Sequence, residues 1–512
     1  MITIENPILP GFNPDPSILR VGSDYYIAVS SFEWLPGIRI YHSTNLAEWT
    51  HCTDLLVDQI DLRGNAQDCS IWAPQISYDQ GTFYCVFTNV RNTTRPFKDC
   101  RNYLMTAPSI TGPWRSPVYL NSGGFDPSLY HDPDGRKWLL NALWDYRKIT
   151  PNKSVGIVMQ EYKETEGLVG PKTNIFSGTN LAKTEAPHLY HHQGYYYLLT
   201  AEGGTGSGHS VTVCRSRAIT GPYEVDPENP MMSANDRQDS PFQCTGHGSL
   251  VQTPEGKWYM SYLMTRPVEG AAILGRETAL QEVYWDVLGW LRVKNGDTIP
   301  DRYLQLPLEA HAQNEAQVFT DDFAQTLLPE WNGRRLVPQE QWCRLKERPG
   351  FLRLMAGESL QSHFDNHLLA VRQKDFSLEA ETLMDYKPSH FNQMAGLVLF
   401  LNEENYLYLY VTYDETKCRV LRMMKNEKGH FTLFDTCVPI KDQPIQLKVV
   451  LEGSQGQFMW RQDQGWQRLP AQSILFLSGG FTGNFIGLCA QDLDQFSGSY
   501  ADFAYFRYQG KC

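Results

Sequence analysis

A short motif recurs five times in the first half of the chain and constrains the fold more than any other feature. The copies read Asp15-Pro16-Ser17-Ile18, Ala73-Pro74-Gln75-Ile76, Asp126-Pro127-Ser128-Leu129, Ala186-Pro187-His188-Leu189 and His247-Gly248-Ser249-Leu250. A glycine turn and then an aromatic strand follow each copy. The spacing of roughly 53 to 61 residues is long enough for one four-stranded blade, so the repeat predicts a β-propeller.

The repeat also brings distant residues together. In a propeller the innermost strand of every blade starts at the central axis, so the leading residues of the repeats converge on one funnel. Three repeats carry a carboxylate there, namely Asp15, Asp126 and Glu185. An Asp-Pro unit alone can be an ordinary turn, but two Asp-Pro-Ser units at the same repeat position are poorly explained by turns. The spacing therefore predicts an active site at the axis.

The second half of the chain has a different pattern. A stretch rich in Pro, Leu, Gln and Ala follows the last repeat, and beyond it apolar and polar residues alternate in short runs separated by turn residues. Such alternation indicates an antiparallel β-sandwich. A chain of 512 residues also exceeds a single compact core. We expect a propeller over 1–305, a linker over 306–320 and a lectin-like sandwich over 321–512.

Composition excludes several kinds of partner. The 45 basic and 57 acidic residues give a net charge of -12, and no basic cluster appears, so neither nucleic acid nor an anionic membrane is an expected partner. No run approaches the roughly 20 apolar residues that span a bilayer. The start of the sequence lacks the pattern of a secretory signal, and the 11 cysteines form no CxxC pair. We expect a cytoplasmic protein with reduced thiols.

Two or three carboxylates around one cavity suit the cleavage of a glycosidic bond. One acid must be protonated to help the leaving oxygen depart, and another must be ionised to activate water. Mutual repulsion and burial separate their pKa values, so both forms can coexist near neutrality. We hypothesise that Asp15 is the general base, Glu185 the general acid and Asp126 the group that tunes the acid.

Sugar recognition needs apolar platforms and polar donors. Phe32, Trp72 and Trp144 lie at or beside a repeat motif or the end of its strand, Arg276 lies on the final blade, and His247 holds the fifth axial position. Taken singly, each such residue more often packs in a core or forms a surface ion pair. The shared register of the repeats favours a binding role for Arg276, His247 and Trp72.

A metal site is the alternative use of the same residues. Asp15, Asp126, Glu185 and His247 could bind Ca²⁺ or a transition metal at the axis. No HExxH motif or EF-hand loop is present. No cofactor is required by this interpretation, and a central Ca²⁺, or a structural one at Asp321, Asp322 and Asp502 in the sandwich, stays open.

Seven motifs in order resemble glycoside hydrolase family 43, specifically its two-domain β-xylosidases. They are Asn13-Pro-Asp-Pro-Ser, Ser31-Phe-Glu-Trp-Leu-Pro-Gly, Ile71-Trp-Ala-Pro-Gln, Gly124-Phe-Asp-Pro-Ser-Leu, Thr184-Glu-Ala-Pro-His-Leu, Gly246-His-Gly-Ser and Leu274-Gly-Arg-Glu-Thr. The resemblance covers the whole chain. It implies a five-bladed propeller, an inverting mechanism, and the roles given above for the three acids.

The resemblance also implies how the sugar is held. The positions that line the glycone pocket in the family match Phe32, Trp72, Trp144, His247 and Arg276. In such enzymes a phenylalanine on a sandwich loop closes the pocket, and the glycine-rich segment 478–485 makes Phe481 the candidate. Family members are often dimers or tetramers, so the resemblance is compatible with a homo-dimer or a homo-tetramer of this chain.

The expected activity is exo-acting release of xylose from the non-reducing ends of short β-1,4-xylo-oligosaccharides. An α-L-arabinofuranosidase, as main or side activity, is the close alternative because the two pentoses present similar hydroxyls. A non-catalytic sugar-binding protein is the alternative from another class, since propellers and sandwiches both serve as lectins. An inverting enzyme should hold the Asp15 and Glu185 carboxyls roughly 6.5–9.5 Å apart.

Overall fold

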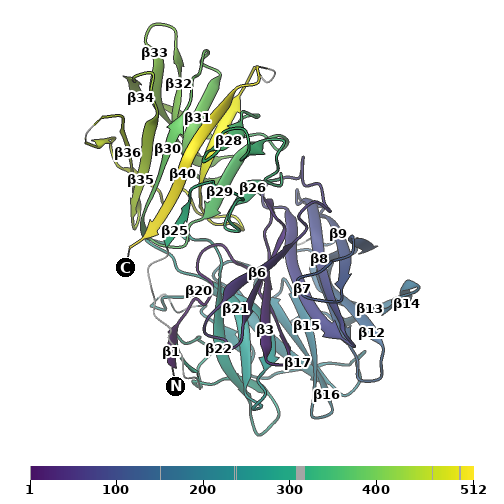
Figure 1. Ribbon diagram of the computed structural model, residues 1–512. Helices are drawn as coiled ribbons and strands as arrows, with labels where there is room; N and C mark the ends of the chain where they lie inside the picture. Colours follow the sequence, from purple (N-terminus) through teal and green to yellow (C-terminus); the bar gives the residue numbers. More distant parts are fainter. Residues whose placement is uncertain are drawn as a thin grey trace.

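The computed structural model describes residues 2–149, 152–235, 237, 239–306, 318–463, 465–494 and 497–511. The named elements in these residues are all β-strands, and they form two domains in contact with each other (Figure 1). No helix in the described part of the chain is long and apolar enough to cross a lipid bilayer. The all-β prediction, a five-bladed propeller followed by a sandwich, is confirmed.

The first domain consists of five antiparallel sheets, each built from consecutive strands. Blade 1 contains β2 (Ser17–Val21), β3 (Asp24–Val29), β5 (Ile38–Ser43) and β6 (Thr50–Leu55). Blade 2 contains β7 (Ser70–Asp79), β8 (Thr82–Asn92), β9 (Asp99–Ala107) and β10 (Val118–Asn121). Blade 3 contains β11 (Gly124–His131), β12 (Lys137–Trp144), β13 (Ser154–Lys163) and β14 (Gly167–Phe176).

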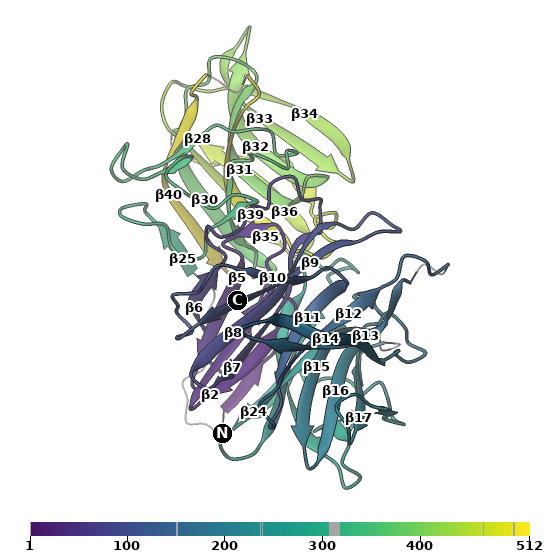
Figure 2. The same ribbon diagram turned by 90° about the vertical axis from the view of Figure 1, so that its right-hand side faces the viewer.

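The last two blades follow the same plan. Blade 4 contains β15 (Glu185–His192), β16 (Tyr195–Glu202), β17 (Ser210–Ser216), β18 (Glu224–Val225) and β19 (Met232–Ser233). Blade 5 contains β20 (Gln243–Gln252), β21 (Trp258–Thr265), β22 (Glu277–Trp285) and β23 (Leu291–Val293). The propeller strands lie together below the sandwich in Figure 2, and β1 (Ile2–Glu5) pairs with β24 (Tyr303–Leu306) beside them. This pairing joins the first and last segments of the domain.

Each repeat motif places one residue in the left-handed region of backbone conformation. The φ angles are 55° at Asp15, 39° at Ala73, 52° at Asp126, 50° at Ala186 and 54° at His247. In blades 2 to 5 the register of the inner strand shifts at this point, which makes a β-bulge. Bulges of this kind bend a strand and redirect a side chain. The five repeats are therefore equivalent in backbone shape as well as in sequence.

Hydrogen bonds between blades hold these strained positions. The Ala73 N–H donates to Ser30 Oγ at 2.7 Å, and the Asp126 N–H donates to Thr88 Oγ1 at 3.2 Å. The Ala186 N–H donates to Asp126 Oδ2 at 3.1 Å. Each left-handed residue costs of order 1–3 kcal/mol, so a neighbouring blade must fix it in place.

A second level of bonds joins the blades deeper along the axis. Ser17 Oγ accepts from the Ile76 N–H at 3.1 Å, and Ser249 Oγ accepts from the Ile18 N–H at 3.2 Å. In the same way Gln75 Oε1 accepts from Leu129 N–H, and the Tyr190 hydroxyl accepts from Leu250 N–H. At three of these four junctions the acceptor is the polar third residue of a repeat motif, namely Ser17, Gln75 or Ser249. This residue therefore helps to join neighbouring blades.

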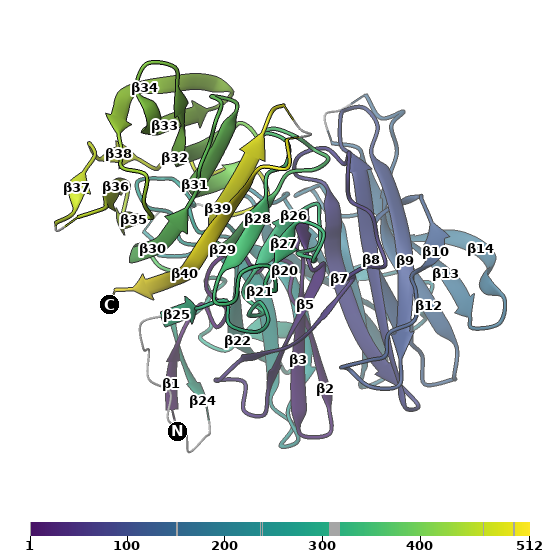
Figure 3. The same ribbon diagram turned by 45° about the horizontal axis from the view of Figure 1, so that its top comes forward.

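The second domain consists of two antiparallel sheets. One has the order β27 (Cys343–Arg344), β28 (Leu352–Met355), β40 (Tyr500–Gly510), β30 (Ser377–Asp385), β35 (Ile445–Glu452), β36 (Gln455–Arg461) and β37 (Gln467–Arg468), with β25 (Val318–Asp321) on β40 and β38 (Gln472–Ser473) on β36. The other has the order β34 (His430–Pro439), β33 (Cys418–Glu427), β32 (Asn405–Asp414), β31 (Gln393–Asn402), β39 (Phe485–Asp492), β29 (Leu368–Arg372), β26 (Asn332–Arg334) and β4 (Trp34–Leu35). The two sheets lie face to face (Figure 3).

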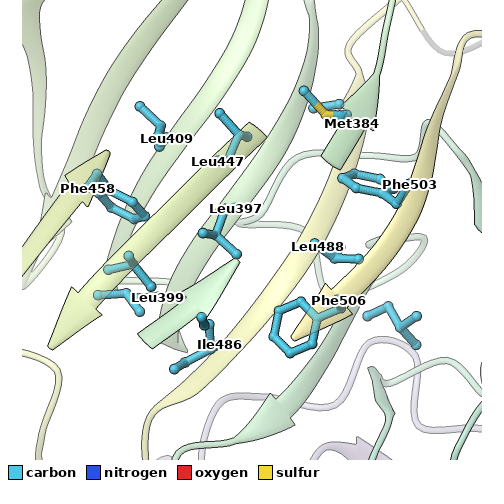
Figure 4. Packing of buried hydrophobic residues seen from close by; sticks show 14 of the residues in the cluster. Met384, Leu397, Leu399, Leu409, Leu447, Phe458, Ile486, Leu488, Phe503 and Phe506 are labelled. Carbon is cyan, nitrogen blue, oxygen red and sulfur yellow. The ribbon is translucent and has the colours of Figure 1, made fainter. Parts of the chain in front are cut away.

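The sandwich core lies between the sheets. Leu378, Ala380 and Met384 alternate with half-buried residues along β30, which is the period of a strand with one buried face. Opposing side chains such as Leu397 and Phe506 fill the space between the sheets (Figure 4). The alternating apolar and polar residues of the sequence therefore correspond to the buried and half-buried sides of such a strand.

The domains share a sheet and an apolar interface. The two-residue strand β4 comes from the propeller, yet it pairs with β26 at the edge of the sandwich. Trp34 in β4 stacks on Phe485 at 3.8 Å between ring centroids, and Phe12 of the propeller meets the same ring at 6.0 Å. The expected linker, 306–320, overlaps residues 307–317, which lie outside the described residues, and β25 already begins at Val318.

A buried cluster of four charges lies beside β4. Glu33, Arg334, Arg335 and Glu403 are each at most 6% exposed. Arg334 binds both carboxylate oxygens of Glu403 at 3.0 and 2.9 Å, and Arg335 also binds Glu403. Burial would raise the pKa of Glu403, but the two guanidinium groups lower it to about 2. The same two guanidinium groups lie 3.7 and 3.9 Å from the Glu33 carboxylate of the propeller, so the cluster links the turn before β32 to that domain.

We predict that Glu403→Ala lowers the free energy of unfolding by about 3–5 kcal/mol, because it leaves two buried guanidinium groups without their main partner. Urea titration followed by circular dichroism measures the change. The control is Glu404→Ala, since Glu404 is the exposed neighbour in the same turn. Equal midpoints for the two variants would contradict the prediction.

Candidate active site

A cavity of about 530 Å³ lies at the axis of the propeller, on the side that faces the sandwich loop. All nine residues expected at the site from the sequence line it: Asp15, Phe32, Trp72, Asp126, Trp144, Glu185, His247, Arg276 and Phe481. Thr93, Arg95, Lys98, Phe125, Asn152, Ser154, Lys183, Gly204 and Thr205 complete the lining. The repeat register therefore brings the three acids of blades 1, 3 and 4 into one pocket.

Asp15 is held by three cationic or polar groups. Arg276 Nη1 donates to Oδ1 at 2.7 Å, the Ser30 hydroxyl donates to Oδ2 at 2.6 Å, and His247 Nδ1 lies 3.6 Å from Oδ1. Burial raises the pKa of Asp15, but Arg276, His247 and Ser30 outweigh it, and the pKa is held below its ordinary value. This arrangement keeps Asp15 ionised.

Glu185 has the opposite environment. Its carboxyl group takes part in no hydrogen bond within the described residues. Burial raises its pKa to about 7; the charge of Asp15 adds to this rise, while Lys98 and Arg276 oppose it. Near neutrality the protonated form is therefore well populated. Asp15 and Glu185 differ in protonation because one has close donors and the other has none.

Asp126 connects these two environments through the backbone. Its Oδ2 accepts from the N–H of Ala186, the residue that follows Glu185. Burial and the negative charges of Glu185 and Asp15 raise the pKa of Asp126 well above its ordinary value. Asp126 thus fixes the start of β15 and adds a further carboxyl group close to Glu185.

Three aromatic rings lie together at one end of the cavity. Phe481 comes from the sandwich loop between β38 and β39, and its ring lies 5.9 Å from Phe32 and 5.5 Å from Trp72 between centroids. Arg276 Nε donates to the Phe481 carbonyl at 3.0 Å. Residues from both domains therefore form this end of the pocket.

The same loop is fixed on its other side by a residue that the sequence did not reveal. Asp68 Oδ1 accepts from the Phe481 N–H at 2.9 Å, and the Asp68 carbonyl accepts from Trp72 Nε1 at 3.2 Å. Gly275 and Gly483 let the two backbones meet, since a Cβ on Gly275 would lie 2.6 Å from the Gly483 Cα. Asp68 lies outside the repeat motif, so only the folded chain identifies it.

The remaining residues lie along the cavity wall. The ring of Trp144 lies 6.3 Å from Phe125, and its Nε1 donates to the Pro96 carbonyl. His247 is buried, and its desolvation lowers its pKa. Lys98, which no sequence pattern indicated, places its ammonium group among the rings of Trp72, Phe125 and Trp144.

The side chains expected to hold calcium in the sandwich have protein partners. Asp502 pairs with Arg353 at 2.7 Å and Arg348 at 3.1 Å. Asp321 accepts from Trp331 Nε1 and from the Phe323 N–H. In the described part of the chain no three His, Cys, Asp or Glu side chains are grouped so as to hold a metal ion. Asp321 and Asp502 are thus already engaged by protein donors, and we derive no step through a metal.

Comparison with known proteins identifies relatives for both domains. Residues 4–291 match the family described as glycosyl hydrolases family 43, and residues 320–509 match the β-xylosidase C-terminal concanavalin A-like domain. The chain is 42% identical to a xylosidase/arabinosidase 43B of Humicola insolens, over 99% of this chain and 98% of that protein.

Two bacterial proteins are similar over their full length. A β-xylosidase of Bacillus subtilis is 39% identical, with 99% of this chain and 100% of that protein covered. The crystal structure of a xylan β-1,4-xylosidase from Bacillus halodurans superposes with a TM-score of 0.96 at 45% identity, covering 99% of this chain and 100% of that one.

Proposed function

The chain belongs to glycosyl hydrolase family 43, and from that premise we propose that it is an exo-acting, inverting β-xylosidase. Its substrate is the non-reducing end of a short β-1,4-xylo-oligosaccharide, from which it releases one xylose. The observation that carries the proposal is the pocket itself: three acids from three blades meet in one cavity, with Asp15 held ionised and Glu185 holding its proton near neutrality. Relatives named as β-xylosidases, alike over nearly the whole chain, support the substrate.

The aromatic end of the cavity supports exo action. The rings of Phe32, Trp72 and Phe481 pack against one another there, which suits a pocket that receives a terminal sugar. Arg276 spends two donor groups on Asp15 and on Phe481, and its Nη2 has no partner within the described residues.

The reaction uses the two protonation states directly. Asp15 takes a proton from a water molecule as the water oxygen attacks C1 of the xylose. Glu185 gives its proton to the glycosidic oxygen, which receives the electron pair of the breaking C1–O bond. One displacement inverts the configuration at C1. The charge on Asp15 is already paired with Arg276, so the base is prepared before the sugar arrives.

Replacing either acid should abolish turnover while the protein stays folded. We expect Asp15→Asn and Glu185→Gln each to lower kcat for xylobiose at least about a hundredfold. Glu185→Gln should spare 2,4-dinitrophenyl xyloside more than xylobiose, because that leaving group needs no proton. Circular dichroism controls for folding. Turnover at the wild-type rate in both variants would contradict the roles of these acids. A wild-type protein that binds xylobiose without cleaving it would instead support the non-catalytic sugar-binding alternative.

The pH dependence follows from the two directions of pKa shift. We expect kcat/KM to fall as the pH rises through about 7, where free Glu185 loses its proton. On the acid side the fall should begin only below the ordinary Asp pKa of 3.8, because Asp15 stays ionised down to that range. Rates with 2,4-dinitrophenyl xyloside in Glu185→Gln, which has no titrating group there, provide the control. An alkaline limb that persists in this variant would contradict the assignment.

Arabinofuranosidase activity is the second candidate, since the Humicola relative is named for both sugars. Assays of 4-nitrophenyl β-xyloside and 4-nitrophenyl α-L-arabinofuranoside, run side by side, rank the two. We expect the larger kcat/KM with the xyloside. A dominant arabinoside rate would reverse the order.

The inverting mechanism has its own test. Proton NMR of the first sugar released from a β-xyloside should show α-xylose, and β-xylose would refute inversion.

We also propose that the reaction needs no metal ion, because Arg276 already neutralises Asp15. Treatment with EDTA should leave kcat unchanged, and restoration of lost activity by Ca²⁺ would contradict this.

A homo-dimer or homo-tetramer stays a proposal that light scattering after gel filtration can test.

A further inference from the structure

An ammonium group lies inside the pocket in a cage of three aromatic rings. Lys98 Nζ is 3.9 Å from the ring centroid of Phe125, 4.4 Å from Trp144 and 4.8 Å from Trp72. Lys98 comes from the loop between β8 and β9 in blade 2, whereas Phe125 and Trp144 come from blade 3. Ring faces attract a cation, so the cage fixes the position of the charge across the junction of two blades.

The cage leaves the donors of this ammonium group unused. Within the described residues Lys98 Nζ has no carboxylate within 4.0 Å and no hydrogen-bond acceptor, although a lysine carries three N–H donors. Groups in such a position are usually satisfied. Because the Lys98 ammonium group has no such partner among the described residues of the cavity wall, we expect its partner to lie inside the cavity.

Glu185 is the acid whose charge Lys98 can balance. The charged groups that face Glu185 are Lys98, Asp15, Arg276 and Lys183, and the charge of Glu185 in turn raises the pKa of Asp126. Arg276 is bound to Asp15 at 2.7 Å, and Lys183 donates to the Gly203 carbonyl on the exposed side. Lys98 differs from both, because its charge has no ion pair of its own in the described residues.

We propose that Lys98 is a positioning residue for the general acid. Its ammonium group stabilises the carboxylate that Glu185 becomes once the proton has passed to the departing oxygen. This inference rests on the proposed glycosidase function.

The proton balance shows what the cation changes. Before the reaction Glu185 is neutral, and afterwards it carries a negative charge while the glycosidic oxygen holds the proton and the electron pair of the broken bond. In the same displacement Asp15 takes the proton of the attacking water, so the negative charge moves from Asp15, which is paired with Arg276, to Glu185, which has no such partner in the part of the chain that the structure describes. A cation fixed in the wall of the same pocket stabilises the new carboxylate and makes Glu185 a stronger acid. Burial lowers the pKa of Lys98, whereas Cys100, Glu185 and Asp126 raise it.

The test compares Lys98→Met, which removes the charge, with Lys98→Arg, which keeps it. The readout is the carboxyl titration of Glu185, followed by NMR in protein labelled with ¹³C-glutamate and assigned with Glu185→Gln. We expect a pKa of about 7 in the wild type. In Lys98→Met we expect it to rise by about one unit, and in Lys98→Arg to stay near the wild-type value. Lys346→Met, at an exposed position in the sandwich, is the control and should change nothing.

Kinetics provide the second arm. In Lys98→Met we expect kcat for xylobiose to fall about tenfold more than kcat for 2,4-dinitrophenyl xyloside, because only the first leaving group needs the proton. An unchanged Glu185 titration in a folded Lys98→Met variant overturns the proposal. An equal fall for both substrates also overturns it, since that result indicates packing or binding alone.

The two arms separate this inference from the function beneath it. The titration requires no turnover, so it tests the coupling of Lys98 to Glu185 even in a protein that cleaves no xyloside. A wild-type protein without xylosidase activity would refute the proposed function. A normal titration shift in that case would keep the electrostatic coupling and refute its catalytic use.

Discussion

The left-handed residue at the head of each inner strand is the constraint on which the pocket depends. A regular strand would send successive side chains to opposite faces, and no carboxylate would be directed along the axis by that pattern alone. The positive φ at Asp15 and Asp126 breaks the pattern just before a proline. Hydrogen bonds from neighbouring blades then hold the strained backbone, as Thr88 does for Asp126. Strain at the active site is thus balanced by contacts between blades rather than within them.

The same architecture gives the three acids different pKa values. Asp15 lies against Arg276 and Ser30, whereas Glu185 has no hydrogen-bond partner in the described residues. Asp126 differs from both, since burial and the charges of Glu185 and Asp15 raise its pKa, and its Oδ2 accepts from the backbone N–H that follows Glu185. Burial alone would raise the pKa of all three carboxyl groups. The specific partners decide which of them ionises.

The sequence predicts much of this because the repeat has a fixed register. Asp15 and Asp126 lead their motifs, and Glu185 stands one residue before the leading Ala186 of its motif. The propeller brings this place in each repeat to the axis, although Asp15 and Glu185 are 170 residues apart (185 − 15) in the chain. Lys98 and Asp68 lie in segments without such a register, so their place in the pocket depends on tertiary packing. The strand β4 was also not predicted, because two residues give no pattern and its partner β26 is far along the chain.

The strand that the propeller lends to the sandwich has a consequence for how such a chain can change. One edge of the sandwich is completed by Trp34 and Leu35, and one wall of the catalytic cavity is completed by Phe481. Each domain is therefore completed by residues of the other, the sandwich by β4 and the cavity of the propeller by Phe481. Separating the two domains would therefore remove a wall from the cavity and an edge strand from the sandwich at the same time.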